Sequence, residues 1–256
     1  MQSIEVARDD AGVVTVTLAR PHRKNALDGP MWDELLETFD AIARSRDDRV
    51  VILTGAGGEF CSGQDLGARD ASTPAYYAMR HVSDVVAALH RVPQPVIAKV
   101  RGNAAGAGMN LALGCDLIVA SETARFSEIF AKRGLSIDAG GSWLLPRLIG
   151  LHRAKELVLL ADIITAAEAA DFGIVNRVVP DAELDQFVAG WAARLAAGPP
   201  IALAQSKELL NHSFARTMEQ ALDAEGVAQS YNFSTKDTYE AMKAFMEKRA
   251  PEFRGR

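Results

Sequence analysis

Short runs of β-branched residues alternate with helical patterns through the first half of this chain, and this alternation limits the possible folds most strongly. The β-branched runs cover residues 13–18, 50–53, 96–100 and 117–120. Between them, apolar residues recur at helical spacing over residues 31–42 and 82–89. Strands that alternate with helices are typical of βαβ units with a parallel sheet. The sequence therefore predicts an α/β fold.

The second half of the chain has few strand signals, and residues that start or stop helices recur at regular intervals. Thr165 and Glu168 form a capping-box pattern, Gly173 is a typical C-terminal stop, and Asp181 is a candidate N-cap. The Gly-Pro-Pro sequence at 198–200 predicts a firm break, after which helices fill residues 201–249 with an interruption near residues 233–234. We therefore expect a mixed core over residues 1–195 and a helical segment over residues 196–256.

Composition excludes several classes of protein. The 256 residues include 28 Lys and Arg against 33 Asp and Glu, a net charge of -5 with no basic stripe, which argues against nucleic-acid binding. Cys61 and Cys115 are isolated, and the five histidines have no metal-ligand spacing, so we expect neither disulfides nor a metal site. No apolar run approaches the roughly 18 to 20 residues of a membrane span, and the first ten residues lack the apolar core of a signal peptide. We therefore expect a cytoplasmic protein with no membrane partner.

Three glycine-containing segments can carry chemistry: residues 54–66, 96–114 and 134–150. The first two begin at or directly after predicted strands, where glycines allow backbone N–H groups to face a ligand. By spacing alone the first segment can be a plain loop, and the small residues of the second can serve close helix packing. The third holds Asp138 before a small-residue turn, where an isolated Asp is more often an N-cap than a catalyst. The chain has no phosphate loop or nucleophile elbow, and Leu111 replaces the third glycine of a dinucleotide fingerprint.

Taken together, the sequences FCSGQDL at 60–66, RGNAAGAGMN at 101–110 and DAGG at 138–141 resemble the crotonase family of enoyl-CoA hydratases and isomerases. The likeness extends over the whole chain and includes residues 20–27, 165–169, 173–179 and 245–249. It implies a spiral of ββα units with a C-terminal helical trimerisation segment. It also implies an acyl-CoA thioester as the substrate, with no separate cofactor. Within the family, residues 63–66 and 138–150 are most similar to the isomerases of phenylacetate breakdown.

The resemblance also implies the chemistry. Family members stabilise a thioester enolate with two backbone N–H groups, which match Ser62 and Ala107 here. The two glutamates that position water in the hydratases correspond to Asn110 and Phe130, and neither side chain is a general acid or base. Asp138 lies where several family isomerases carry an acidic residue that moves a proton between carbons. We therefore expect an isomerase with Asp138 as its general base, and Glu128 as a substitute base.

Further residues are expected to contact the substrate or to tune the base. By resemblance, the acyl-CoA contacts are Gly63, Gln64, Asp65, Leu66, Asn110 and Phe130, and the acyl group is selected by residues within 67–90. The CoA phosphates would meet Arg23, Lys24 and Lys248, the last from a neighbouring subunit, although each is equally a candidate solvated surface charge. Apolar neighbours would raise the pKa of Asp138, although at helical spacing they can equally be ordinary core: Phe130, Ile137, Trp143 and Leu144.

Two other functions stay open at this point. One is an enoyl-CoA hydratase that uses groups other than the two missing glutamates. The other is a homologue that binds CoA thioesters without converting them, because those glutamates are absent. In each case the resemblance implies a homotrimer or a dimer of trimers. Apolar residues between 233 and 246 provide a face that is compatible with subunit packing.

Overall fold

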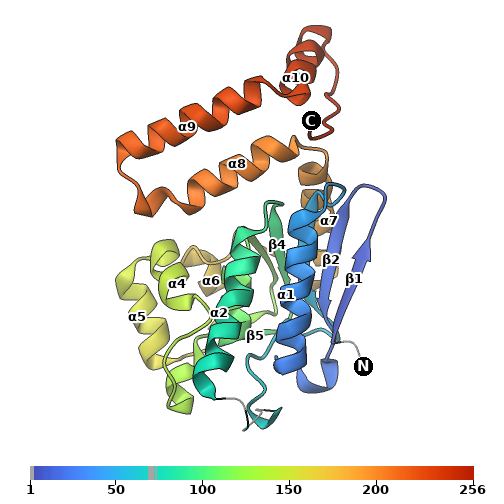
Figure 1. The fold of residues 1–256 in the computed structure, drawn as a ribbon. Coiled ribbons are helices and arrows are strands. Elements are labelled where there is room, and N and C mark those ends of the chain that lie inside the picture. The colour runs from blue at the N-terminus through green and yellow to red at the C-terminus, as the bar shows by residue number, and fades with distance from the viewer. Residues whose placement is uncertain (1–2, 69–71, 73) are drawn as a thin grey trace.

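Two β-sheets form the centre of the molecule, which is a computed structural model that describes residues 3–68, 72 and 74–256 (Figure 1). The six-stranded sheet has the order β1-β2-β3-β4-β6-β9, and all its neighbours are parallel except β1 and β2. Its strands are β1 (Ile4–Arg8), β2 (Val13–Leu18), β3 (Val50–Gly55), β4 (Val96–Val100), β6 (Leu117–Ser121) and β9 (Arg177–Val179). The smaller sheet comprises β5 (Asn103–Ala105), β7 (Arg125–Ser127) and β8 (Ile164–Thr165). The predicted α/β class is confirmed.

The two sheets are built from repeated units. In each unit the first strand joins the large sheet and the second joins the small one, as in β4 with β5 and in β6 with β7. Helix α3 (Ala107–Leu113) follows β5, while the 3₁₀ helix η3 (Ile129–Arg133) and α4 (Gly141–Ile149) follow β7. This arrangement is the ββα spiral that the resemblance implied, and it stacks the segments after β3, β5 and β7 beside one another.

Both faces of the large sheet are covered at its central strand β3, which explains why this strand is a continuous apolar run. Along β3, Val51 and Leu53 belong to the main core, which also contains the buried faces of α1 (Gly29–Arg44) and α2 (Ala75–Arg91). Val50 and Ile52 alternate with them and pack with α7 (Leu184–Ala196) on the opposite face. Cys61 and Cys115 are buried free thiols in the main core. The chain is therefore folded around two apolar layers that hold the strand ends rigidly.

The remaining elements are short. They are η1 (Pro21–Arg23), η2 (Leu66–Ala68), α5 (Leu151–Leu160), α6 (Ala166–Asp171), η4 (Asp181–Glu183) and η5 (Ser213–Ala215). Thr165 caps α6 through the predicted capping box with Glu168. The predicted N-cap at Asp181 is wrong, because its carboxylate accepts hydrogen bonds from Ser121 Oγ at 2.7 Å and Arg101 Nε at 2.9 Å. Asp181 therefore joins η4 to β6 instead of capping a helix.

The last quarter of the chain consists of helices that extend away from the sheets (Figure 1). They are α8 (Pro200–Asn211), α9 (Met218–Phe233) and α10 (Lys236–Glu247). The breaks at 198–200 and after Phe233 lie where the sequence predicts them. An additional break between α8 and α9 was not predicted, and Thr217 begins α9 there with a capping box to Gln220. Lys207 holds α8 to the core through an ion pair with Asp116 at 2.7 Å.

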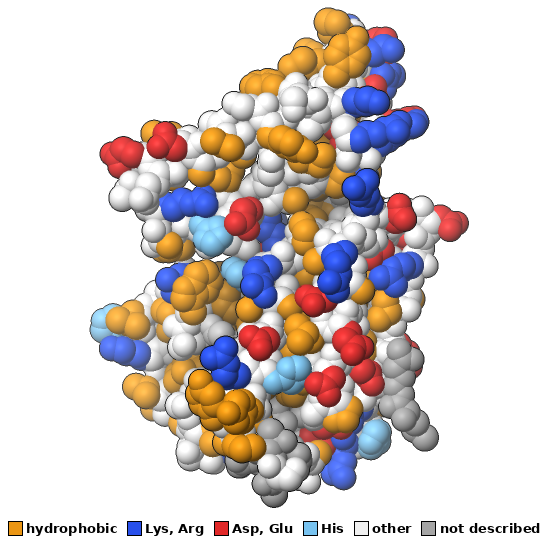
Figure 2. Space-filling view, in the orientation of Figure 1, with side chains coloured by type: hydrophobic (Ala, Val, Ile, Leu, Met, Phe, Trp, Pro, Cys, Tyr) orange, Lys and Arg blue, Asp and Glu red, His pale blue; other side chains and the backbone are white. Residues whose placement is uncertain are grey.

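The C-terminal helices expose many large apolar side chains, some of which are visible on the face shown in Figure 2. The exposed set is Leu210, Phe214, Met218, Leu222, Val227, Tyr231, Phe233, Tyr239, Met242, Phe245 and Met246. Among the described residues, no single helix is long and apolar enough to cross a membrane. One pair of consecutive helical segments, Asp181–Ala196 and Pro200–Asn211, is long and apolar enough when the two are taken together, but the chain bends by 105° between them.

Candidate active site

The segment after β3 lies between two other parts of the chain. On one side Cys61 N–H donates to Asn103 O and Ala105 N–H donates to Cys61 O, both at 2.9 Å, so the segment runs parallel to β5. On the other side Leu27 N–H donates to Gly63 O and Asp65 N–H donates to Leu27 O, both at 2.8 Å. These bonds fix the direction of every backbone N–H group between residues 61 and 65.

The structure contradicts the expectation for Ser62. Its N–H donates to Lys24 O at 3.0 Å, so the group is already used in joining the segment to the loop after β2. The N–H of Gln64 is different, because Leu27 bonds to residues 63 and 65 and leaves the residue between them facing the opposite way. Within the described part of the chain, Gln64 N–H has no hydrogen-bond acceptor. The free donor of this loop is therefore two residues later than the sequence comparison suggested.

Ala107 supplies a second free N–H group. It is the first residue of α3, where backbone N–H groups have no partner within the helix. Gly63, with φ +93°, lies against this helix start, since a Cβ atom on Gly63 would be 2.8 Å from Ala105 O and 3.6 Å from Ala107 N. Gly108 is equally tight, because a Cβ atom there would overlap Cys61. Glycine at both positions lets the two free donors lie on segments in direct contact.

The side chains of the 64–66 turn mainly hold the turn in place. Gln64 Oε1 accepts from Trp32 Nε1 at 2.9 Å, and Asp65 forms an ion pair with Arg20 at 3.0 Å. That guanidinium keeps the pKa of Asp65 below its usual value, against the opposing effect of burial. Leu66 is exposed. Of the predicted substrate contacts in this turn, two side chains are thus occupied in the fold and one is open.

Behind α3 lies a cluster of polar side chains without cations. Asn110, on α3, is completely buried, and its Nδ2 donates to Asp138 O at 2.9 Å and approaches Glu128 Oε2 at 3.4 Å. Gly141, the first residue of α4, makes room for it, because a Cβ atom on Gly141 would overlap the Asn110 amide. The structure therefore brings Asn110, Glu128 and Asp138 together from three different elements.

Asp138 is not an N-cap. The N-cap of α4 is Gly140, with no side-chain capping bond. The carboxyl oxygen Oδ1 of Asp138 is instead buried without a hydrogen-bond partner among the described residues. Burial raises the pKa of Asp138 to about 6, because removal from water disfavours the charged form. An unpaired carboxyl group with a pKa near neutrality is suited to general base work.

Glu128 lies directly after β7 and its side chain is completely buried. Burial first, and then the charge of Asp138, raise its pKa to about 8, while the Asn110 hydrogen bond opposes the rise. The sequence offered this residue only as a substitute base, because nothing in the local pattern predicts that it packs under α3. Its burial is a product of the tertiary fold.

The apolar side chains that were predicted to surround Asp138 differ in how deeply they are buried. Phe130 is buried beside the start of α3, where a Cβ atom on Gly106 would be 3.6 Å from Phe130 Cζ. Ile137 and Leu144 are half-buried. Trp143 is 40% exposed and packs against the His90 ring and the Arg147 guanidinium, so it is not the buried neighbour that we expected.

The candidate CoA cations are all on the surface. Lys24 is exposed and pairs with Glu59 at 3.0 Å, and Arg23 precedes it on the exposed η1. Lys248 ends α10 at φ 55°, in the C-terminal segment. Within the region expected to select the acyl group, residues 69–71 and 73 lie outside the described residues. The structure leaves the roles of these cations as predictions.

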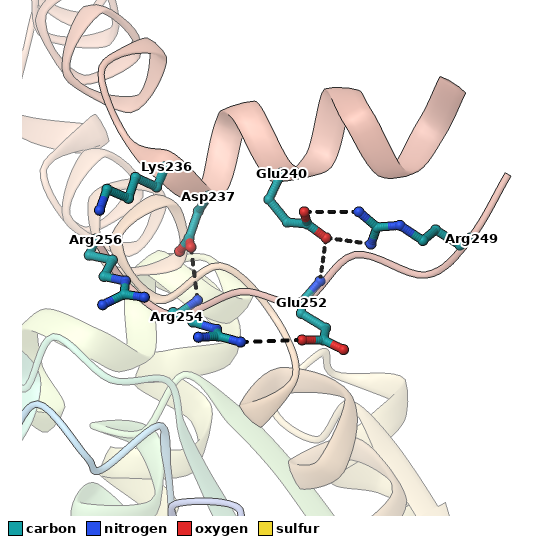
Figure 3. A pocket seen from close by; sticks show the side chains of 7 residues that line it. All are labelled: Lys236, Asp237, Glu240, Arg249, Glu252, Arg254 and Arg256. Atoms are coloured by element: carbon teal, nitrogen blue, oxygen red, sulfur yellow. Dashed lines mark hydrogen bonds and ion pairs between the residues drawn. The ribbon is translucent and has the colours of Figure 1, made fainter. Parts of the chain in front are cut away.

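A cavity of about 390 Å³ lies away from this cluster, within the C-terminal segment (Figure 3). Its charged side chains are largely paired internally: Glu240 with Arg249, and Arg254 with Glu252. The Asp237 carboxylate accepts from the backbone N–H groups of Arg254 and Gly255, both at 2.8 Å. The cavity is therefore formed where the last residues are fastened to α10. Among the described residues, no group of three His, Cys, Asp or Glu side chains could hold a metal ion.

Comparison with known proteins gives a consistent result. The family model described as enoyl-CoA hydratase/isomerase matches residues 8–256. A 1,2-epoxyphenylacetyl-CoA isomerase of Escherichia coli K12 is 37% identical over 262 residues, covering 100% of both chains. The crystal structure of an enoyl-CoA hydratase from Bacillus anthracis is 36% identical, covers 100% of both chains and superposes with a TM-score of 0.94. A putative enoyl-CoA hydratase of Thermobifida fusca YX in complex with CoA is 36% identical, with 91% and 93% coverage and a TM-score of 0.84.

Proposed function

The chain belongs to the enoyl-CoA hydratase/isomerase family, and from this premise we propose that it is an acyl-CoA isomerase that works through a thioester enolate. The observation that carries the proposal is Asp138, whose buried carboxyl oxygen has no partner among the described residues and whose pKa is raised to about 6. The isomerase of E. coli that matches the whole chain supports the same reaction type. The CoA complex of the T. fusca protein supports an acyl-CoA ligand.

In the proposed reaction the Asp138 carboxylate removes a proton from C2 of a 3-enoyl-CoA. The C2–H bond breaks, its electron pair enters the thioester, and a dienolate forms with negative charge on the thioester oxygen. The same carboxyl group then returns the proton to C4, so that the double bond moves from C3–C4 to C2–C3. The reaction consumes no water and needs no second substrate.

We place the enolate oxygen on the N–H groups of Gln64 and Ala107, in place of the Ser62 and Ala107 pair that the resemblance implied. Both N–H groups are without a protein acceptor in the described part of the chain, and Gly63 brings their segments into contact. Donors fixed before the reaction stabilise the charge that develops, and each is worth about 3 to 4 kcal/mol in comparable sites.

The activity should have an acidic limb in its pH profile. Only the ionised carboxylate of Asp138 accepts a proton, and its pKa is about 6. We therefore expect kcat/KM to rise with pH through a midpoint near 6 and to level off between that midpoint and pH 7.5. A profile measured from pH 4.5 to 7.5 with trans-3-hexenoyl-CoA checks this. A flat profile across this range would exclude a base with this pKa.

Lys24 is proposed to contact the CoA phosphates. Its side chain is 61% exposed and stands at the edge of the loop that holds the Ser62 N–H. We expect Lys24→Ala to raise KM about two- to tenfold, the effect of one hydrogen bond to a charged group at a solvated surface, with a smaller effect at high salt. Lys155→Ala, on the exposed face of α5, is the matched control. Equal KM values for the two variants would remove Lys24 from the binding site.

A hydratase is the second candidate function, since relatives with that name match the whole chain. The two reactions differ in what enters the product. Incubation of crotonyl-CoA in H₂¹⁸O should leave the thioester free of ¹⁸O if the protein is an isomerase only. Incubation of trans-3-hexenoyl-CoA in D₂O should introduce deuterium in those turnovers in which the Asp138 carboxyl group exchanges its proton with the solvent before it protonates C4. Binding without either label would indicate a homologue that binds CoA thioesters without catalysis.

We also propose that the C-terminal helices pack against other copies of this chain, as a trimer or a dimer of trimers. The support is the set of large apolar side chains that α9 and α10 expose in a single chain, including Tyr239 at 73% and Phe245 at 85%. Large apolar side chains left exposed in a single chain are a mark of protein interfaces. Sedimentation velocity with the complete chain gives the number of copies.

A further inference from the structure

Asn110, Glu128 and Asp138 form a carboxyl cluster, and three of its buried oxygen atoms have no hydrogen-bond donor among the described residues. They are Asn110 Oδ1, Glu128 Oε1 and Asp138 Oδ1. When they are ionised, both carboxyl groups can accept hydrogen bonds but cannot donate them. The Nδ2 group of Asn110 is already directed at Glu128 Oε2 and Asp138 O. The cluster thus contains more acceptors than donors, which is unfavourable for buried groups.

The cluster is also short of positive charge. No Lys, Arg or His of the described chain forms an ion pair with Glu128 or Asp138. Glu128 is the more buried of the two, with a completely inaccessible side chain. A second negative charge at that depth, next to Asp138, would be both desolvated and repelled. One proton on Glu128 removes that charge and adds the missing donor.

The surrounding elements contribute no other charge to Glu128. From α3 it meets the neutral Asn110, and from the loop before α4 it meets Asp138, whose charge raises the Glu128 pKa. On η3 itself Lys132 points to Asp162, with which it pairs at 3.5 Å, and Arg133 is exposed. The charged residues of α5, which packs on η3, are exposed: His152, Arg153, Lys155 and Glu156.

We propose that Glu128 is a positioning residue of this site that works as a neutral carboxylic acid: its carboxyl group holds Asn110 against the loop that carries Asp138, and its proton keeps Asp138 the single negative charge of the cluster. This inference rests on the proposed role of Asp138 as the base. Glu128 itself exchanges no proton with the substrate.

The inference predicts an alkaline limb in the activity. Burial and the Asp138 charge raise the pKa of Glu128 to about 8, so the residue ionises above that pH. A second negative charge then lies beside Asp138 and the developing enolate, and it opposes the formation of further negative charge there. We expect kcat/KM for trans-3-hexenoyl-CoA to fall about tenfold for each pH unit above a midpoint near 8.

Glu128→Gln tests this directly, because glutamine has nearly the same shape and stays neutral at every pH. We expect kcat at pH 7 to fall about two- to tenfold, the effect of altering one hydrogen bond, and the alkaline limb to disappear. Glu156→Gln, the same change at an exposed position on α5, should keep the wild-type profile. An unchanged alkaline limb in Glu128→Gln overturns the inference. So does a loss of turnover at all pH values as large as that of an Asp138 variant, which would make Glu128 a catalytic residue.

Two further measurements do not depend on turnover. In the infrared difference spectrum of the wild type between pH 7 and pH 9.5, we expect loss of one protonated-carboxyl band that Glu128→Gln lacks, and absence of the band in the wild type overturns the inference. Because the folded state binds this proton more tightly, the free energy of unfolding should fall as pH rises from about 4.5 to about 8. That fall should be smaller in Glu128→Gln. If Asp138 is not the base, its variants keep turnover while this band is still present, so the two failures are distinct.

Discussion

Asp138→Asn should lose nearly all isomerase activity, with kcat for trans-3-hexenoyl-CoA about 10² to 10⁴ times lower than in the wild type. The change keeps the shape of the side chain and removes only its capacity to accept a proton. The buried oxygen without a partner becomes part of a neutral amide, and the carboxyl group whose pKa is raised to about 6 is lost. Steady-state kinetics at pH 7, together with deuterium incorporation into the thioester from D₂O, measure the loss.

The Kd for an unreactive acyl-CoA should change little, since the change does not touch the proposed CoA contacts. Asp171→Asn, at the exposed end of α6, is the matched control and should behave as the wild type. Wild-type deuterium incorporation by Asp138→Asn would remove Asp138 as the base. The base would then be sought in Glu128, the other carboxyl group of the cluster.

Gly63→Ala should produce the second largest effect, with kcat about 10² to 10³ times lower, the magnitude that follows loss of one oxyanion donor. Gly63 has φ +93°, and a Cβ atom would lie 2.8 Å from Ala105 O. Relief of that contact must move the segment away from α3, which separates the N–H groups of Gln64 and Ala107. Since the enolate gains more from these donors than the thioester does, we expect the loss mainly in kcat.

Gly58→Ala separates backbone strain from the geometry of the site. Gly58 has a similar φ of +79°, but a Cβ atom there would have no heavy atom within 4 Å. We expect this control to lower the thermal midpoint, as does Gly63→Ala, while kcat stays at the wild-type value. If both variants lower kcat equally, the effect comes from backbone strain and not from the separation of two donors.

The strands and the helix breaks could be predicted from the sequence more fully than the site. The β3 sequence is a continuous apolar run because the strand is covered on both faces, and such a run is visible without a structure. The breaks at residues 198–200 and after Phe233 are equally local, since proline and helix-capping residues act on their own backbone. The break before Thr217 escaped prediction although its capping box with Gln220 is also local.

The choice of Asp138 as a candidate base came from the family resemblance, since the local pattern by itself favours an N-cap there. What the sequence determined by itself is the alternation of strands and helices and the position of the glycine turns. These depend on conformational preferences and residue spacing, which are properties of short segments. Only the tertiary structure decided which backbone N–H groups have no acceptor and which carboxyl groups are buried away from solvent. Ser62 N–H donates to Lys24 O, from a loop far away in the sequence. Gln64 N–H has no acceptor because Leu27 of that loop bonds to the residues on either side of Gln64. Glu128 is buried next to Asn110 of α3 and Asp138 of the loop before α4, so its proton affinity depends on packing that no local pattern contains.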